Sequence, residues 1–323
     1  ALLNNQPMGF YPSHVLINDA RRHGVRVFAP DINTSGVRCA VEDLNGIRIG
    51  LGYVRSLGGD AARQIVLERT ANGPYRSLAD FMRRCPISQD AIENLIVVGA
   101  FDRFGLGRRE ALWQVGLFVP SKRFGRGKRT PADEKGRQIA LPLPVAQDMV
   151  ELRPMGAWEQ MEADYAVLGM SARYHPLGLL RNRLPARYVN TRAVETLPTG
   201  EVIEIAGLIV CRQRPGTAKG VQFLLLEDEV GLVNVVVQPW LYEKRRLVVR
   251  GEPFLVIVGE VQHQGGAINI VARDVFPLEE ARRHYNDITI DKKAMPTARQ
   301  LLDTVDNEEG ILATIKPSSH NYY

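Results

Sequence analysis

The sequence has few cysteines and no apolar run long enough to cross a membrane. Its 323 residues include three cysteines, Cys39, Cys85 and Cys211, which are far apart and show no C-x-x-C spacing. This pattern argues against a disulfide framework and against a zinc module, so we expect buried, reduced thiols. No apolar stretch approaches the roughly 18 residues of a membrane span, and the first residues lack the regions of a signal peptide. We therefore expect a cytoplasmic protein with no membrane partner.

Residue patterns that would carry catalysis are also missing. The six histidines show neither metal-ligand spacing nor a Ser or Cys partner, so we expect each at the surface or at a helix end; they are His14, His23, His175, His263, His284 and His320. The carboxylates Glu227, Asp228 and Glu229 resemble a two-magnesium site, but they end a strand pattern just before Gly231. Turn geometry and solvation explain them better. We predict no catalytic residue and no metal site.

The charge balance favours a polyanionic partner weakly. Lys and Arg number 41 against 36 Asp and Glu, a formal net charge of +5. The chain begins at Ala1 rather than at a methionine, and "ALLNN" resembles the end of a helix. We therefore expect a C-terminal piece of a longer protein, with any active site upstream.

The first part of the chain predicts a helix and a hairpin. "SHVLINDARRHG" has apolar residues at helical spacing behind a Ser13 N-cap, and Gly24 is a plausible stop, which together predict an amphipathic surface helix. Two short strand patterns then flank Asn45-Gly46, a dipeptide suited to a type I′ turn with positive φ at both central residues.

Two helix-hairpin-helix units are predicted next. Leu57-Gly58-Gly59 separates an apolar segment from a helix, and a second helix from about Gln89 is followed by a turn over 99–107 and a helix from Arg108. Such hairpins bring backbone amides and a helix N-terminus close to phosphates without reading sequence. We predict duplex contacts from Gly58, Gly59, Gly99 and Arg108. The alternative is that each unit is an ordinary pair of packed helices.

A basic, Gly- and Pro-rich stretch over 120–141 predicts a flexible linker. A helical connector over 142–199 follows, in which Trp158, Met161, Tyr165 and Leu168 lie on one helical face. That stripe indicates packing rather than a cofactor pocket.

From residue 200 onward, five strand patterns with a helical interruption at "PWLYEKRRLVV" outline an OB-fold barrel. Its first loop, "RQRPGTAKG", has the position that meets single-stranded nucleic acid in this fold. We predict that the cations of this loop follow a phosphate chain and that its glycines let amides approach; the residues are Arg212, Arg214, Gly216, Lys219 and Gly220. Gln264-Gly265-Gly266 would form the facing loop. Alternation does not decide whether Phe223 stacks on a base or is core.

Several longer segments carry a family resemblance. "LLNNQPMGFYP", "DARRHGVRVFAPDIN", "GLGYVRSLG", "GAFDRFG", "VLGMSARYHPL" and "RQRPGTAKGVQFLLLEDEVGLVNVVV" resemble the C-terminal region of bacterial C-family DNA polymerases, in particular the error-prone, translesion branch of the DNA polymerase III alpha subunit. The resemblance runs from Ala1 to about Glu280.

The resemblance implies a multidomain α+β architecture. Residues 1–43 would be the end of the polymerase fingers, 44–119 the tandem helix-hairpin-helix domain that holds duplex DNA, 200–277 the OB-fold that meets the single-stranded template, and 278–323 a tail. The family's palm aspartates and their Mg²⁺ would precede Ala1. This piece would then hold no cofactor and be inactive alone, while the parent protein would be a DNA-directed DNA polymerase, a nucleotidyltransferase of damage-induced translesion synthesis and DNA repair.

Two departures from the replicative relatives concern partners. Their sliding-clamp motif, Q-x-x-[LM]-F, has only a degenerate counterpart at Gln147 and Met149, and the better match over 114–118 lies inside an expected helix. This argues against direct clamp binding. The chain also ends soon after the OB-fold, with no room for a clamp-loader domain, so accessory translesion proteins are the expected means of recruitment.

Two other functions remain to be weighed. The barrel could be a protein-docking module, because apolar faces and basic loops do not specify their partner. A NAD-dependent DNA ligase uses similar modules, but the chain lacks a K-x-D-G nucleophile motif and four zinc-spaced cysteines, and its modules come in the wrong order.

Overall fold

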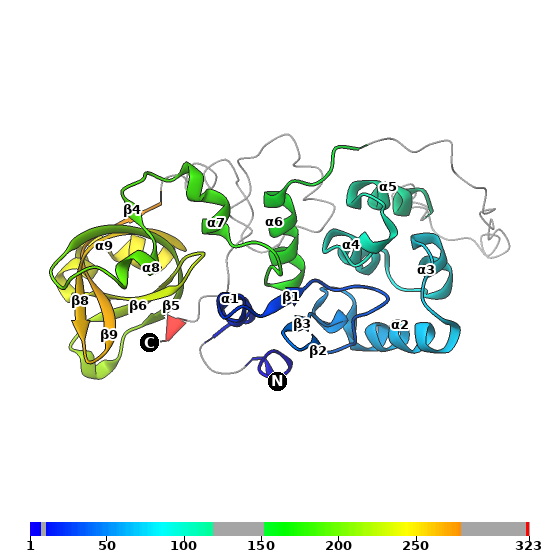
Figure 1. The fold of residues 1–323 in the computed structure, drawn as a ribbon, viewed down its shortest axis with the longest axis horizontal. Coiled ribbons are helices and arrows are strands. Elements are labelled where there is room, and N and C mark those ends of the chain that lie inside the picture. The colour runs from blue at the N-terminus through cyan, green and yellow to red at the C-terminus, as the bar shows by residue number, and fades with distance from the viewer. Residues whose placement is uncertain (8–10, 119–151, 279–320, 323) are drawn as a thin grey trace, which may run out of the picture.

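The computed structural model describes residues 1–7, 11–118, 152–278 and 321–322. A helical part and a β-barrel follow one another along an elongated molecule, and α1 and α6 are the helices of the helical part that lie nearest the barrel (Figure 1). The predicted linker over 120–141, the clamp-like residues Gln147 and Met149, and nearly all of the predicted tail lie outside the described residues.

The helical part has one continuous core. Its elements are α1 (Ser13–Arg22), β1 (Arg26–Phe28), β2 (Ala40–Asp43), β3 (Gly46–Arg48), η2 (Leu51–Tyr53), α2 (Gly58–Asn72), α3 (Leu78–Arg84), α4 (Gln89–Val97), η3 (Asp102–Phe104), α5 (Arg108–Phe118) and α6 (Ala157–Leu168). Ile17, Ile65, Phe81 and Leu95 are fully buried in this core. Ser77 and Ser88 cap α3 and α4 by accepting hydrogen bonds from backbone amides, which fixes where both helices begin.

The predicted hairpin is present, but the predicted turn type is wrong. β2 and β3 are antiparallel, and β3 also pairs in parallel with β1. Neither Asn45 nor Gly46 has a positive φ. Gly46 is needed for a different reason, because a Cβ there would lie 2.7 Å from Cε2 of Phe28. The glycine therefore provides close packing rather than a left-handed turn.

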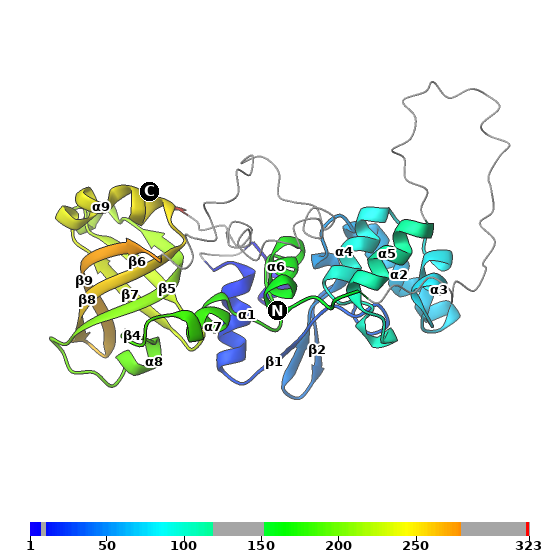
Figure 2. The ribbon, with the colours of Figure 1, turned by 90° about the horizontal axis from the view of Figure 1, so that it is seen from above.

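The predicted five-stranded barrel is confirmed. It consists of β5 (Val202–Gln213), β6 (Gln222–Glu227), β7 (Leu232–Val237), β8 (Phe254–Gln264) and β9 (Ala267–Pro277), with α9 (Pro239–Gly251) between β7 and β8. Antiparallel pairing of β5 with β8 and parallel pairing of β7 with β9 close the barrel. Figure 2 shows α9 across one end of it. The short strands β4 (Tyr188–Val189) and β10 (Asn321–Tyr322) pair in parallel with β5.

Strand β5 takes part in both halves of the barrel. Residues 202–208 pair with β8 and residues 208–213 pair with β6, so the strand changes partner at Leu208. Just before this point, a Cβ on Gly207 would lie 2.3 Å from Cδ2 of Leu226. A glycine is therefore required where the strand passes so close to its neighbour.

The predicted surface helix α1 is instead an interior element. Its Ile17 belongs to the core of the helical part, while its Val15 packs in a second cluster with Tyr165 of α6, Leu177 of α7 (Pro176–Leu180) and Leu208 of β5. A single amphipathic stripe in the sequence did not reveal that α1 has two partners. The predicted packing stripe on α6 is confirmed, since Met161, Tyr165 and Leu168 are buried and Trp158 packs against the second cluster. The helices η5 (Arg181–Arg183) and α8 (Thr191–Val194) lead into the barrel.

Two histidines also differ from expectation. His14 and His175 are buried where α1 and α7 meet the barrel, not at the surface. The three cysteines are free thiols; Cys85 and Cys211 are buried, and Cys39 is partly exposed. Among the described residues, no helix has the length and apolar character that a membrane span needs.

Candidate nucleic-acid interface

The loop between β5 and β6 presents two exposed cations. It turns through the 3-10 helix η6 (Gly216–Ala218), after which Lys219 has a φ of 48° and Gly220 a φ of 90°. The guanidinium of Arg214 lies 4.9 Å from the centre of the Tyr242 ring on α9, which gives the start of the loop a cation-π contact. Arg214 and Lys219 therefore project from a loop that is held to the barrel at one end.

The glycines of this loop differ in how much they are needed. The backbone at Gly220 is left-handed, and a Cβ there would lie 3.5 Å from Cγ of Pro239, so the loop passes close to the start of α9. Around Gly216 nothing lies within 4 Å of an added Cβ. Gly216 is exposed, and a side chain at this position would meet no neighbouring atom.

Arg212 does not belong to this open surface. Its side chain is buried and donates hydrogen bonds to the carbonyls of Val249, at 2.8 Å, and Glu252, at 2.6 Å. Burial lowers its pKa to about 10. Arg212 joins strand β5 to the C-terminal end of α9, and the expectation that it follows a phosphate chain is corrected accordingly.

Phe223 lies on the outer face of the barrel rather than in its core. Its side chain is 37% exposed, whereas its neighbours along β6, Gln222 and Leu224, are buried. Across the sheet Phe223 is paired with Gln213 on one side and Val236 on the other, and Val236 is paired with Val271. A row of outward side chains therefore begins beside the cationic loop with one exposed aromatic ring.

A second, more polar row runs beside the first. Asn234 is paired with Leu225 and Asn269, and Asn269 is paired with Gln262. Gln262 is two residues from the β8–β9 turn, where Gly265 and Gly266 have φ values of 59° and 82°. The two rows thus cover the outer face between the two loops that the sequence singled out.

The first predicted hairpin of the helical part is exposed at its glycines. A 3-10 turn, η2, precedes it, and Gly58 and Gly59 begin the fifteen-residue helix α2. Gly58 has a φ of 72°, and nothing lies within 4 Å of an added Cβ. The first amides of a helix have no intrahelical acceptor, so this N-terminus can meet an anion.

The second hairpin has a different arrangement from the one expected. Arg108 is buried; it donates to both carboxylate oxygens of Asp102, at 3.0 and 2.7 Å, and to the carbonyl of Val97 at 2.7 Å. A Cβ on Gly99 would lie 2.3 Å from Nη2 of Arg108. Gly99 and Arg108 therefore lock α4 to α5, and the exposed positions of this hairpin are Asp102, Arg103, Gly105 and Gly107. In the sequence, the two glycines of "FGLG", residues 104–107, indicate this exposed turn.

The predicted turn role of the carboxylate cluster is confirmed for Asp228, but the predicted solvation is wrong, because Glu227 and Asp228 are fully buried. Asp228 is fully buried and accepts hydrogen bonds from Val230 and Gly231 amides and from the Thr191 hydroxyl. Glu229 is held by Arg181 in two hydrogen bonds of 2.7 and 2.9 Å. Within the described ranges, no three His, Cys, Asp or Glu side chains are grouped to hold a metal ion.

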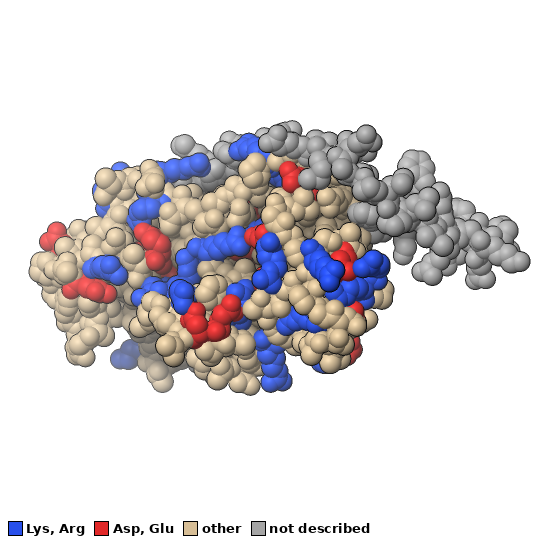
Figure 3. Space-filling view, turned by 45° about the vertical axis from the view of Figure 1, so that its right-hand side comes forward, with Lys and Arg blue, Asp and Glu red and all other residues tan. Residues whose placement is uncertain are grey.

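The surface of the molecule carries many cations. In Figure 3, Lys and Arg are spread over the middle and right of the face that is turned to the viewer, with smaller patches of Asp and Glu among them. Many of the described arginines are paired with carboxylates, as Arg187 is with Glu204 and Arg273 with Glu260. No carboxylate of the described residues forms an ion pair with Arg214 or Lys219, so these two loop cations stand out for an anionic ligand.

Comparison with known proteins supports the resemblance. The family described as "Helix-hairpin-helix motif" matches residues 24–111. The error-prone DNA polymerase of Mycolicibacterium paratuberculosis is 42% identical over 274 residues, which are 84% of this chain and 24% of that protein. The error-prone DNA polymerases of Anaeromyxobacter sp. strain K and Corynebacterium efficiens are 37% and 41% identical, each over 86% of this chain and 24% of their own length. The resemblance of this chain to the error-prone DNA polymerases is therefore confirmed, over a segment that makes up 24% of those proteins.

Proposed function

We propose that this chain is the DNA-holding, C-terminal part of an error-prone DNA polymerase that acts in damage-induced translesion synthesis and DNA repair. The helix-hairpin-helix part grips the primer-template duplex, and the OB-fold barrel meets the single-stranded template. The palm aspartates and their Mg²⁺ belong to the preceding part of the parent enzyme, a DNA-directed DNA polymerase. No residue of this chain then transfers a nucleotide.

One observation supports the single-strand role most strongly. Two exposed cations, Arg214 and Lys219, border an outer barrel face that begins with the exposed ring of Phe223. Cations can follow the phosphates while an aromatic ring stacks on a base, and neither contact depends on base identity. A polymerase that copies damaged templates needs this tolerance of sequence.

The duplex role is supported by the exposed hairpin backbone. Gly58 and Gly59 present the first amides of α2, and Arg103, Gly105 and Gly107 lie on the exposed turn between α4 and α5. Contacts of this kind position a duplex through its backbone. Gly99 and Arg108 act indirectly, by holding the second hairpin in shape.

The proposal is tested by fluorescence anisotropy with three labelled DNAs: oligothymidylate, a blunt duplex, and a primer-template that joins duplex to single strand. We expect the primer-template to bind tightest, because both parts of the chain contact it. Equal affinity for all three DNAs would contradict the proposal that the helix-hairpin-helix part binds duplex and the barrel binds single strand. The region of the gene that precedes the codon for Ala1 is also expected to encode the palm aspartates.

A protein-docking role is the second candidate, and α9 favours it. This helix exposes Trp240 by 58% and Leu247 by 86%, with the exposed cations Lys244 and Arg246 beside them. Accessory translesion proteins are the partners this role would have, while direct clamp binding stays outside the proposal. A Trp240→Ala and Leu247→Ala double variant that kept full DNA affinity but lost recruitment to damage would favour docking at α9.

A further inference from the structure

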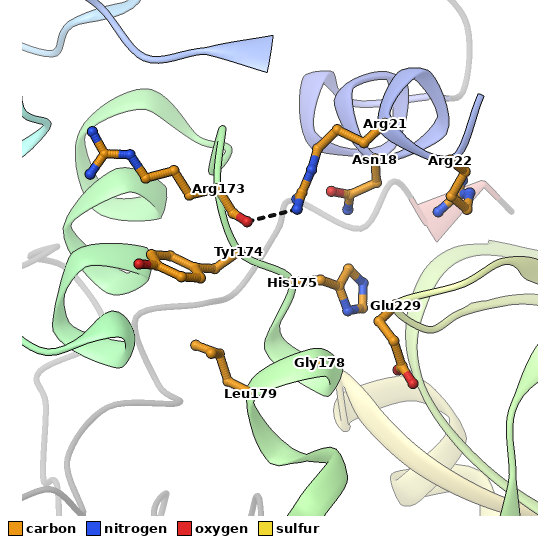
Figure 4. A pocket seen from close by; sticks show the side chains of 9 residues that line it. All are labelled: Asn18, Arg21, Arg22, Arg173, Tyr174, His175, Gly178, Leu179 and Glu229. Atoms are coloured by element: carbon orange, nitrogen blue, oxygen red, sulfur yellow. Dashed lines mark hydrogen bonds between the residues drawn. The ribbon is translucent and has the colours of Figure 1, made fainter. Parts of the chain in front are cut away.

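A pocket of about 350 Å³ lies where the helical part meets the barrel (Figure 4). Asn18, Arg21 and Arg22 of α1 form one side, and the segment from Arg173 to Leu179 forms another. Glu229, in the turn between β6 and β7, completes the lining. The pocket is separate from the cationic barrel loop and from both hairpins.

Three arginines line the pocket, and only two of them are paired with carboxylates among the described residues. Arg22 is paired with Glu227 at 2.9 Å, and Arg173 with Asp102 at 3.1 Å. Arg21 instead donates to the backbone carbonyl of Arg173 at 2.6 Å, the contact drawn as a dashed line in Figure 4. A neutral carbonyl leaves the positive charge of Arg21 uncompensated.

The carboxylates near the pocket are already engaged. Glu229 is held by Arg181, and in Figure 4 its carboxylate points away from Arg21. Glu227, which is fully buried, accepts hydrogen bonds from Arg22 and Asn18. These anions therefore balance other cations and do not neutralise Arg21.

Two buried nitrogen atoms at the pocket lack a hydrogen-bond partner. One is Nε2 of His175, a residue that is only 7% exposed, and the other is Nη2 of Arg22. Nδ1 of His175 accepts a hydrogen bond from the amide of Leu177, so in the neutral ring the proton is on Nε2. The nearest carboxylate oxygens lie 3.9 Å from this Nε2 and 3.6 Å from Nη2. Each nitrogen therefore faces a carboxylate at a distance too long for a good hydrogen bond, and a buried donor that is not fully satisfied is costly.

We propose that this pocket binds a phosphate group, either a phosphodiester of a nucleic-acid strand or free inorganic phosphate. A phosphate has several strong acceptor oxygens in a tetrahedral arrangement, so it can meet donors that approach from α1 and from His175 at once. Its negative charge would balance Arg21. Binding of inorganic phosphate does not depend on the proposed function. Binding of a nucleic-acid strand rests on that function and would add a DNA contact between the barrel and the hairpins.

The test is a ³¹P NMR titration of inorganic phosphate with the full chain, in which binding broadens and shifts the phosphate signal. Arg21→Gln keeps a donor for the Arg173 carbonyl but removes the charge, and we expect it to weaken phosphate binding at least about tenfold. Arg26→Gln is the matched control, because Arg26 is exposed on β1 and is paired with Asp43. Circular dichroism checks that each variant is folded. If Arg21→Gln does not fold, Arg21→Met, which keeps the length of the side-chain stem but removes the charge, replaces it, with the same loss expected.

Addition of oligothymidylate separates the two sources. Displacement of phosphate, with weaker oligothymidylate binding by Arg21→Gln, identifies a strand; binding of phosphate without displacement identifies the free anion. The proposal is overturned if the unchanged chain leaves the phosphate signal unaltered, or if folded Arg21→Gln binds as the unchanged chain does. The double variant Arg214→Ala and Lys219→Ala should bind inorganic phosphate normally, so failure of this pocket and failure of the barrel loop are distinguishable.

Discussion

The guanidinium of Arg22 on α1 lies 2.9 Å from the carboxylate of Glu227 on β6, and this partly buried ion pair joins residues 205 positions apart in the sequence. A second hydrogen bond to Glu227 helps offset the cost of burying its charge, since Asn18 also donates to this carboxylate at 3.4 Å. The barrel is therefore attached to the helical part through polar as well as apolar contacts.

Breaking this pair should destabilise the chain. Glu227→Leu leaves Arg22 buried without its carboxylate, and we expect a loss of about 3–5 kcal/mol in the free energy of unfolding. The double variant Arg22→Met and Glu227→Leu removes both charges and should recover much of that loss. Urea unfolding of the two variants and the unchanged chain measures both values. A double variant as unstable as Glu227→Leu would show that the uncompensated charge is not the cause.

Low pH should weaken the contact between the helical part and the barrel. Burial lowers the pKa of His14 from 6.5 to about 4, with Glu227 opposing and His175 adding to the shift. The unfolded chain takes up this proton near pH 6.5 and the folded chain only near pH 4. The contribution of neutral His14 to stability is therefore complete above pH 6.5 and is lost as the pH falls towards 4.

His14→Gln should reduce this acid sensitivity. Between pH 7 and pH 5 we expect the unchanged chain to lose about 1–2 kcal/mol more in unfolding free energy than the variant. His23→Gln is the control on the same helix, since His23 is exposed. Equal pH dependence in His14→Gln and the unchanged chain would refute the assignment.

The two cations of the barrel loop should act differently from the buried arginine beside them. Arg214→Ala with Lys219→Ala should weaken oligothymidylate binding and flatten its salt dependence by about 0.7 log units per lost phosphate contact, without a change in unfolding free energy. Arg212→Ala should lower stability instead, because it removes the hydrogen bonds to Val249 and Glu252. Anisotropy at several salt concentrations and urea unfolding separate the effects. Loss of stability in the double variant, or none in Arg212→Ala, would reverse the assignment.

Phe223 and Phe276 offer a matched test of base stacking. Their exposed fractions are nearly equal, 37% and 38%, but Phe276 lies under the guanidinium of Arg245, whose carbon is 4.7 Å from the ring centre. Phe223→Ala should cost about 1–3 kcal/mol in oligothymidylate affinity, the range for one stacked base, and Phe276→Ala should cost little. Equal losses would mean that Phe223 has no special role in binding.

The two hairpin glycines should respond differently to alanine. Gly58→Ala should lower the unfolding free energy by about 1–2 kcal/mol, the cost of a positive φ for alanine, because the space around the added Cβ is open. Gly99→Ala adds a clash with Arg108 and should lower the unfolding free energy further. Thermal unfolding of both variants compares them, and equal losses would contradict the locking role of Arg108.

Much of the fold could be predicted because it follows from local pattern. Helix spacing placed α4, strand alternation placed β5 to β9, and the glycine-rich strings marked the turns at Gly58 and Gly220. The predicted Ser13 cap of α1 is wrong, because Pro12 is the N-cap and Ser13 is the first residue of the helix. What α1 packs against could not be predicted in this way, because its two partners, the helical core and the barrel, lie far from it in the sequence.

For the candidate nucleic-acid interface, the sequence indicated which loop to consider but not which of its residues are exposed. Arg212 and Arg214 are two positions apart in a basic string, yet one is buried against α9 and the other is exposed, and only the tertiary fold separates them. His175 was misplaced for the same reason, because it faces Glu227 of β6. Arg108 was misplaced although Asp102 and Val97 lie in its own hairpin, because the sequence does not show that its side chain turns inward to them. The pocket around Arg21 gave no sequence signal beyond the basic end of α1.

The most direct test of the account is the salt dependence of DNA binding by the intact chain. We predict that it binds oligothymidylate and primer-template in dilute buffer, and that the logarithm of each association constant falls linearly with the logarithm of salt concentration. Absence of binding to both DNAs at low salt, or binding that salt does not weaken, would contradict the claim that exposed cations and hairpin amides hold the nucleic-acid backbone.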